Sequence, residues 1–204
     1  SPAAAISSAA GPILTISTAT RGCDASPQCG DLAVAIPLDS GRTAIVVIDV
    51  AGHGISRASL SSAIADVILG ALIDDESPAS ALERADRHLH GVDDETPYAV
   101  AFVGLVHPGL RTVVYASAGH DCAFTLAEDG GMTHHMPTAP MLGTPLANHA
   151  CDAAFTFQPA ETLVVVSDGI SDSRRAGSQD FFGASRTAVA VIRIATVVRP
   201  LSGT

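Results

Sequence analysis

The sequence of 204 residues contains no lysine and no tryptophan, and only 4% of its residues are aromatic. Its 11 basic residues are therefore all arginines, and they are outnumbered by 21 acidic residues, which gives a formal net charge of −10. This imbalance argues against binding to nucleic acid or to an anionic membrane, because few positive charges are there to neutralise phosphates. A phosphorylated partner would need local attraction, from a bound cation or a few arginines.

Long hydrophobic runs and closely spaced cysteines are also absent. No apolar run approaches the roughly 20 residues of a membrane-spanning helix. Residues 1–12 lack the basic start of a signal peptide, so we expect a flexible N-terminal segment there. The four cysteines are scattered, and Cys23 and Cys29 are spaced too widely for a zinc knuckle. We therefore expect free thiols and a cytoplasmic protein.

The hydrophobic content, 47% of all residues, is that of a folded globular protein. At this length we expect one domain over residues 13–204, large enough to bury roughly 70% of the surface of its unfolded chain. Eight segments have the composition of strands and are separated by turn signals. These segments are 13–19, 32–38, 43–49, 99–107, 111–117, 122–127, 151–157 and 162–167.

Two helices interrupt the strands. The first follows Gly54 and ends near Ile73, and the second begins at Pro78 with Ser77 as its N-cap and runs toward His90. Short turns such as Pro108-Gly109 favour antiparallel hairpins between neighbouring strands. The sequence therefore predicts an α+β fold, an antiparallel β-sandwich with helices outside. The segment 181–204 fits either a strand or a helix.

The most informative stretch is 44–54, where β-branched residues lead into Asp49 and then a Gly-His-Gly turn. A buried strand of this kind carries one carboxylate to its own end, and the glycines allow close approach of the backbone. The pattern returns where an apolar strand leads into Asp168-Gly169. A third carboxylate, Asp31, follows Cys29-Gly30.

Each of these aspartates alone would fit a turn or a helix cap. Three of them at the ends of elements, each beside a glycine, instead favour a site for Mg²⁺ or Mn²⁺, which prefer oxygen ligands and retain waters. Two such ions that share one carboxylate can activate a water for attack on phosphorus.

Six motifs follow one another along the chain: Cys29-Gly30-Asp31 and the segments 48–54, 115–120, 141–143, 167–172 and 181–183. Their order resembles that of SpoIIE-type phosphatases, which belong to the metal-dependent PPM (type 2C) serine/threonine phosphatases. The resemblance covers roughly residues 17–185, nearly the whole chain. The short form and the Cys-Gly-Asp motif look similar to the RsbU/RsbX group.

The resemblance implies a four-layer αββα fold, an antiparallel β-sandwich flanked by helices on both sides, with two Mn²⁺ or Mg²⁺ ions at one end. It implies that Asp49 bridges both ions, that the carbonyl of Val50 and the carboxylate of Asp168 each bind one, and that Asp31 binds directly or through water. The residues that would support these ligands are Gly52, His53, Gly54 and Gly169.

Several polar residues have two interpretations. Arg21 could hold a phosphate with its planar guanidinium, although a surface position fits it equally well. Because the ligands in the family are carboxylates, a structural hydrogen-bonding role suits His53 and His120 better than acid catalysis. His134 and His135 are expected to face solvent from a loop.

The sequence departs from the family at its end. The family closes its metal site with an Asp-Asp pair before a last strand, and no acidic residue follows Asp180 here. We expect the chain to stop inside the preceding helix, so that this last metal-ligand strand is missing. Alternatively the helix is deleted, and Arg186-Thr187 stands in place of the pair.

Two functions remain open. The first is a metal-dependent phosphoserine/phosphothreonine phosphatase that acts on a phosphorylated anti-sigma-factor antagonist or a stressosome-type protein. The second is a catalytically weak pseudophosphatase that binds such a regulator. A Ser-His-Asp hydrolase is excluded because the chain has no Gly-x-Ser-x-Gly motif.

Overall fold

The computed structural model describes residues 4–6, 14–16, 29–53, 55–91, 97–121, 123–146, 149–158 and 160–167. The chain divides into two compact units, one formed by Ser1–Asp121 with Met136–Phe157 and the other by Cys122–His135 with Gln158–Thr204. Each unit contains an antiparallel sheet, and the two helices of the described residues belong to the first unit. The predicted α+β class is therefore confirmed.

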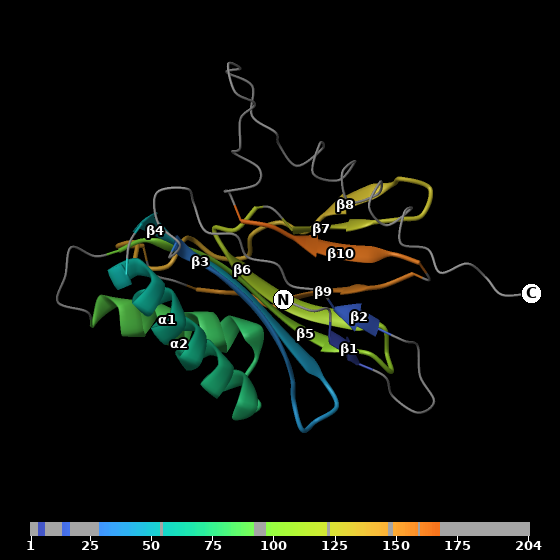
Figure 1. Ribbon diagram of the computed structural model, residues 1–204, viewed down its shortest axis with the longest axis horizontal. Helices are drawn as coiled ribbons and strands as arrows, with labels where there is room; N and C mark the ends of the chain where they lie inside the picture. The colour runs from blue at the N-terminus through green and yellow to red at the C-terminus, as the bar shows by residue number, and fades with distance from the viewer. Residues whose placement is uncertain are drawn as a thin grey trace, which may run out of the picture. The chain divides into compact units, whose positions relative to one another are not determined.

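The first unit is built on a five-stranded antiparallel sheet with the order β3-β4-β5-β6-β9. The strands are β3 (Cys29–Pro37), β4 (Thr43–His53), β5 (Ala99–His107), β6 (Thr112–Ala118) and β9 (Ala153–Thr156). The sequence predicts both ends of β5 correctly, and the ends of the other four differ by four residues or fewer. Figure 1 shows β3, β4 and β5 side by side.

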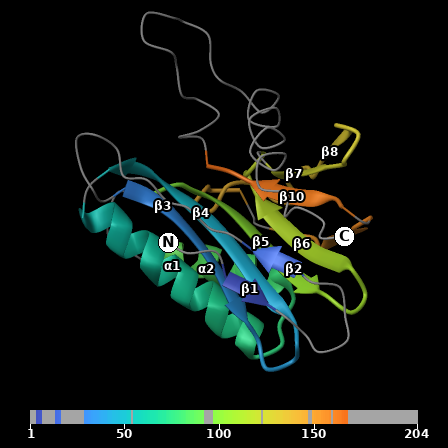
Figure 2. The same cartoon turned by 45° about the vertical axis from the view of Figure 1, so that its right-hand side comes forward.

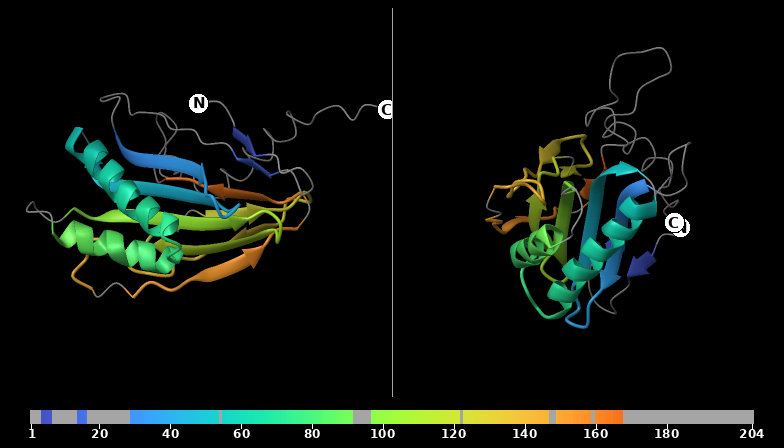
Figure 3. Two further views of the ribbon diagram at one scale, coloured as in Figure 1. Left: turned by 90° about the horizontal axis from the view of Figure 1, so that it is seen from below. Right: turned by 90° about the vertical axis from the view of Figure 1, so that its left-hand side faces the viewer.

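Helices α1 (Ile55–Ile73) and α2 (Pro78–His90) cover one face of this sheet, as Figures 2 and 3 show. Strand residues alternate between the two faces, so Val46, Ile48 and Val50 of β4 all project toward the helices and are buried. The helices add to the same core a set of buried apolar side chains: Ile64, Ala65, Ile68, Ala71, Leu72, Ala79, Ala81, Leu82, Ala85 and Leu89.

The start of α2 agrees with the sequence. Ser77 is its N-cap, and the Ser77 Oγ accepts a hydrogen bond of 3.3 Å from the backbone N–H of Ser80. Pro78 follows in the first turn, where its missing N–H has no helical partner to lose. The helix therefore begins at the residue where local chemistry favours it.

The second unit contains a three-stranded antiparallel sheet with the order β10-β7-β8. Its strands are β7 (Ala123–Leu126), β8 (Met132–His134) and β10 (Thr162–Val165). The turn around Asp129-Gly130 joins β7 to β8, as the turn signals predict. Strand β8 was not predicted, because three residues are too few for an alternating pattern to be recognised.

His134 and His135 are both expected to face solvent, and the prediction is wrong for His135. His134 is exposed on β8, but His135 is only 6% exposed, and its backbone N–H donates to the carbonyl of Ala123 at 2.8 Å. Burial lowers the pKa of His135, the neighbouring His134 lowers it further, and Glu161 acts in the opposite direction. Pairing of β8 with β7 brings His135 inside, and the sequence alone does not show that pairing.

Two further segments differ from expectation. Ala4–Ile6 forms strand β1 and pairs with β2 (Leu14–Ile16), within a stretch expected to begin with a flexible tail. Strand β4 does not end at Asp49 but continues to His53, so the predicted turn after Asp49 is wrong. The segment 181–204 lies outside the described residues. No helix among the residues described is long and apolar enough to cross a membrane.

Candidate metal centre

Two of the predicted ligands lie opposite each other on neighbouring strands. In the register of β3 and β4, Asp31 is the direct partner of Asp49. Directly opposed residues in an antiparallel pair project from the same face, with Cβ atoms about 4.5–5.5 Å apart. Both side chains are half-buried. The fold therefore places two carboxylates close together, an arrangement that like charges disfavour and that a cation between them would stabilise.

A register shift makes the backbone beside these carboxylates irregular. Cys29 pairs with His53 and Asp31 with Asp49, so β3 has one residue between the two pairs, Gly30, whereas β4 has three. Irregularities of this kind disrupt the local ladder and re-aim backbone and side chains. Past Asp49, β4 continues as a strand to His53, and it faces Gly30 out of the regular register.

The carbonyl of Val50 lies directly against Gly30. The backbone N–H of Ala51 donates to the carbonyl of Tyr98 on the β5 side, at 3.0 Å. Because neighbouring residues of a strand direct their backbone groups to opposite sides, the groups of Val50 point toward β3. A Cβ added to Gly30 would lie 2.3 Å from the carbonyl oxygen of Val50, so only glycine fits here.

Helix α1 is anchored to this same point. Ser61 is buried, and its Oγ lies 2.6 Å from the carbonyl oxygen of Gly30 and 2.8 Å from that of Arg57. A hydroxyl has one hydrogen to donate, so the two carbonyls share it. Ser61 thus fixes the carbonyl side of Gly30, while Val50 packs against its Cα.

A loop joins the same end of the sheet from the other side. The backbone N–H and carbonyl of Leu142 pair with those of Ala99, at 2.9 and 3.1 Å, and Ala99 is the β5 partner of Val50. Buried Asp86 of α2 accepts a hydrogen bond of 2.8 Å from the backbone N–H of Gly143. The Met-Leu-Gly motif is therefore held between a strand and a helix.

The motif 115–120 contains a second Gly-His pair, Gly119-His120, whose surroundings the structure describes. His120 is only 3% exposed, and its ring centroid lies 6.3 Å from that of Phe102. Its backbone carbonyl accepts a hydrogen bond of 2.7 Å from the hydroxyl of Ser117. His120 is therefore part of the core, and the hydrogen-bonding role expected for its ring stays a prediction. Nearby, burial raises the pKa of Tyr115, whose hydroxyl donates to the carbonyl of Met136.

A family model described as Stage II sporulation protein E (SpoIIE) matches residues 39–200, more than three quarters of the sequence. The chain belongs to the SpoIIE family. This SpoIIE-family chain is similar to the phosphoserine phosphatase RsbP of Bacillus subtilis, with 28% identity over 153 residues. The match covers 72% of the chain but only 38% of RsbP, so the chain spans well under half the length of that relative.

Solved structures share the fold at lower identity. The RsbU and RsbW domains of Rv1364c from Mycobacterium tuberculosis align with a TM-score of 0.71 and 20% identity, over 87% of the chain and 49% of that protein. RsbX, crystallised in complex with magnesium, aligns with a TM-score of 0.58 and 19% identity, over 82% of the chain and 80% of RsbX. These alignments confirm the PPM phosphatase fold that the sequence motifs imply.

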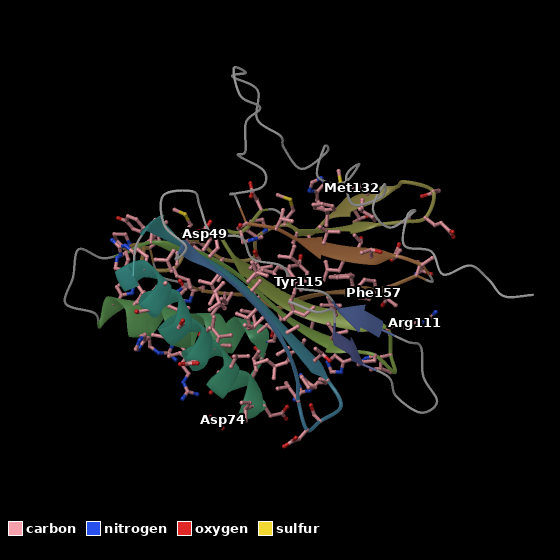
Figure 4. All side chains as sticks on the ribbon, in the orientation of Figure 1. Asp49, Asp74, Arg111, Tyr115, Met132 and Phe157 are labelled. Carbon is pink, nitrogen blue, oxygen red and sulfur yellow. The ribbon has the colours of Figure 1, made fainter. Side chains whose placement is uncertain are left out.

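The structure of the SpoIIE-family chain describes only some of the predicted site residues. It brings Asp31, Asp49 and the Val50 carbonyl together at one end of the five-stranded sheet, and Figure 4 shows Asp49 at that end and Arg111 at the other. The backbones of Gly52 and His53 lie on β4 and not in a turn. The remaining predicted residues lie outside the described residues: Arg21, Gly54, Asp168 and Gly169.

Within the described ranges no group of three or more His, Cys, Asp or Glu side chains forms a possible metal site. The oxygen donors that are described nevertheless fit a hard cation, because two opposed carboxylates lie beside a backbone carbonyl that packs against a glycine. Sequence reasoning missed Ser61 and Asp86. The available signal was a polar residue within each buried helical stripe, next to Ile64 and Ile68 in α1 and to Leu82 and Leu89 in α2.

Proposed function

We propose that this SpoIIE-family domain is a metal-dependent phosphatase that hydrolyses phosphoserine or phosphothreonine on a regulatory protein. The observation that carries the proposal is the direct opposition of Asp31 and Asp49 beside the carbonyl of Val50. Opposed carboxylates are costly in a protein unless a cation offsets them, and oxygen ligands suit Mg²⁺ and Mn²⁺. Similarity to RsbP, a phosphoserine phosphatase, supports the class of substrate.

Each residue then has a defined role. Asp49 would be shared by the two ions, the Val50 carbonyl would help to hold one of them, and Asp31 would bind directly or through a water. Asp168 completes the ligands and Arg21 orients the phosphate, both as predictions from the sequence. When bound, the ions would supply an activated water and stabilise the negative charge on the phosphoryl oxygens. Gly30 and Ser61 fix the backbone on which these ligands stand.

The proposed substrate is a phosphorylated anti-sigma-factor antagonist or a stressosome-type protein. Support comes from similarity to RsbP and from the fold shared with RsbX and with the RsbU domain of Rv1364c. Because the formal net charge is −10, the chain as a whole repels a phosphorylated partner, so the bound cations must provide the attraction locally.

Hydrolysis of p-nitrophenyl phosphate tests the proposed activity. We expect turnover with Mn²⁺, no turnover in EDTA, and poor rescue by Ca²⁺, because an octahedral oxygen site that keeps its waters suits the smaller ion. Full activity in chelator would contradict metal dependence. Binding of a phosphorylated regulator without any turnover under saturating Mn²⁺ would instead favour the pseudophosphatase alternative.

A further inference from the structure

The row of opposed residues that contains the carboxylates continues across the sheet. Asp31 on β3 is opposite Asp49 on β4, and Asp49 is opposite Val100 on β5. Directly opposed residues project from the same face of a sheet. These three side chains therefore share the face that points away from helices α1 and α2, since Ile48 and Val50 point toward the helices.

Met141 is the next member of this row. The loop that contains it pairs antiparallel with β5, Leu142 being opposite Ala99. That register places Met141 opposite Val100, on the face of Asp49. Neighbouring strands are about 4.8 Å apart, so Met141 stands roughly 10 Å from Asp49 in the direction across the strands.

The backbone of a second glycine fixes the side chain of Met141. A Cβ added to Gly119 would lie 2.3 Å from the Cγ of Met141, and the φ of Gly119 is +63°, so a side chain at position 119 would be strained and would displace Met141. The N–H of Gly119 donates to the carbonyl of Ala139 at 3.0 Å. Together with the bond from Gly143 to Asp86, this holds Met141 in place although it remains 42% exposed.

A second exposed apolar side chain lies beside Met141. Tyr98 is two residues before Val100, hence on the same face, and it is 46% exposed. In the register of β5 with the loop, Tyr98 and Met141 are diagonal neighbours, within reach of each other for side chains of this length. Exposed apolar groups next to a polar site can contact an apolar group of a bound partner, and methionine adapts to different apolar partners.

We propose that Met141, with Tyr98 beside it, binds an apolar side chain of the phosphoprotein substrate, two or three residues from the phosphoserine. The inference rests on the proposed function, which places the phosphate over Asp31 and Asp49. An extended peptide advances about 3.3 Å per residue, so two or three residues span most of the distance from Asp49 to Met141. Met141 lies in the same row of opposed residues as Asp31 and Asp49, so the substrate segment that carries the phosphate is the part that would contact it.

Peptide binding to the 204-residue chain with Mn²⁺ tests this inference independently of turnover. The probes are fluorescein-labelled nine-residue alanine-based peptides with a central phosphonate analogue of phosphoserine, in which CH₂ replaces the bridging oxygen. Leu or Ser is placed two or three residues before or after the centre, and dissociation constants are measured by anisotropy. We expect the Leu peptide to bind about fivefold more tightly than its Ser counterpart for at least one placement.

Three variants test whether the preference for the Leu peptide depends on Met141. Met141→Ser should reduce the preference for Leu to about twofold or less, whereas Met141→Leu should retain it because the contact stays apolar. Met136→Ser is the matched control, because this methionine is also exposed, at 66%. Its backbone carbonyl accepts a hydrogen bond from the hydroxyl of Tyr115, which Figure 4 labels in the middle of the sheet. Met136→Ser should keep the full preference.

Two results would overturn the inference: equal affinity for Leu and Ser peptides at all four placements, or a preference that survives Met141→Ser. A failure of the proposed function has a different signature. In that case p-nitrophenyl phosphate is not hydrolysed with Mn²⁺, while the comparison of Leu and Ser peptides still decides whether Met141 is a binding residue.

Discussion

The two ends of the β3–β4 pair differ in the regularity of their register and in the charges that they bring together. At the turn end, residues pair in regular register from Asp31–Asp49 to Pro37–Thr43, and a tight turn closes the hairpin with a 2.8 Å bond from the N–H of Leu38 to the carbonyl of Arg42. At the carboxylate end, the register shifts at Gly30, and like charges oppose each other. Regular pairing supplies stability, and the irregular end gathers carboxylate oxygens that stability alone would not favour, as the proposed metal site requires.

The largest expected effect of a single substitution is at Asp49. Asp49→Asn removes the charge shared by both ions, so phosphatase activity should fall at least about 100-fold. In the metal-free domain the substitution relieves repulsion from Asp31, and the unfolding free energy should change by no more than about 1 kcal/mol. Hydrolysis at saturating Mn²⁺ and thermal melting in EDTA measure the two effects. Near-wild-type turnover of the variant would remove Asp49 from the site.

Glycine at position 30 is the next most sensitive point. Gly30→Ala places a Cβ 2.3 Å from the carbonyl oxygen of Val50, so the backbone must move. We expect a loss of about 1–3 kcal/mol in unfolding free energy and at least a tenfold loss of activity.

Gly109, at the turn end of the sheet, is the matched control for Gly30. A Cβ at Gly109 would meet nothing within 4 Å, so Gly109→Ala should change neither stability nor activity noticeably. Urea denaturation and p-nitrophenyl phosphate hydrolysis compare the pair. Equal behaviour of the two variants would show that the close approach at Gly30 has no consequence.

The anchor from helix α1 should have a smaller effect. Ser61→Ala leaves the buried carbonyl of Gly30 without its 2.6 Å hydroxyl donor, at a cost of about 1–3 kcal/mol in unfolding free energy, with weaker Mn²⁺ binding. The neighbouring Ser62 is exposed and its Oγ donates to the carbonyl of Ala58 within the same helix, so Ser62→Ala should stay within about 0.5 kcal/mol. Chemical denaturation and metal titration of both variants measure this; a Ser61→Ala protein with unchanged Mn²⁺ affinity would limit Ser61 to stability.

The smallest effect is expected at the turn end. Arg42, which follows the β3–β4 turn, forms an ion pair with Asp75, whose side chain is 78% exposed. An exposed pair contributes about 0–1 kcal/mol and is screened by salt, and Asn also tolerates the positive φ of residue 75. Asp75→Asn should therefore change melting only slightly and activity not at all. A large loss of activity would mean that the two ends are coupled.

The sequence predicts those parts of the fold that depend on neighbouring residues, and it misses those that depend on contacts between distant segments. Both ends of β5 and the capped start of α2 follow from neighbouring residues, through β-branched alternation and the Ser77-Pro78 pair. Strand β8 is too short to show a pattern, and the burial of His135 depends on its pairing with β7.

The candidate site is predicted in part. The sequence singles out Asp31 and Asp49 as candidate ligands because each stands in a motif with a glycine, and the family resemblance adds the carbonyl of Val50. It does not predict that Asp31 and Asp49 are direct partners, since that depends on the register of two strands. Contacts between distant residues are equally invisible, such as Ser61 with Gly30. Asp168 and Arg21 remain predictions.

Binding of Mn²⁺ tests the central claim most directly. Electron paramagnetic resonance measures free Mn²⁺ during titration of the wild-type chain and of two variants. Asp49→Asn removes one negative charge from the carboxylate end, and Asp75→Asn removes one just after the C-terminal end of α1. Figure 4 labels Asp74, the residue next to Asp75. We predict that wild type and Asp75→Asn bind Mn²⁺ alike and that Asp49→Asn binds at least tenfold more weakly. Equal affinity in all three proteins would contradict the account, because the opposed carboxylates would then not be the metal site.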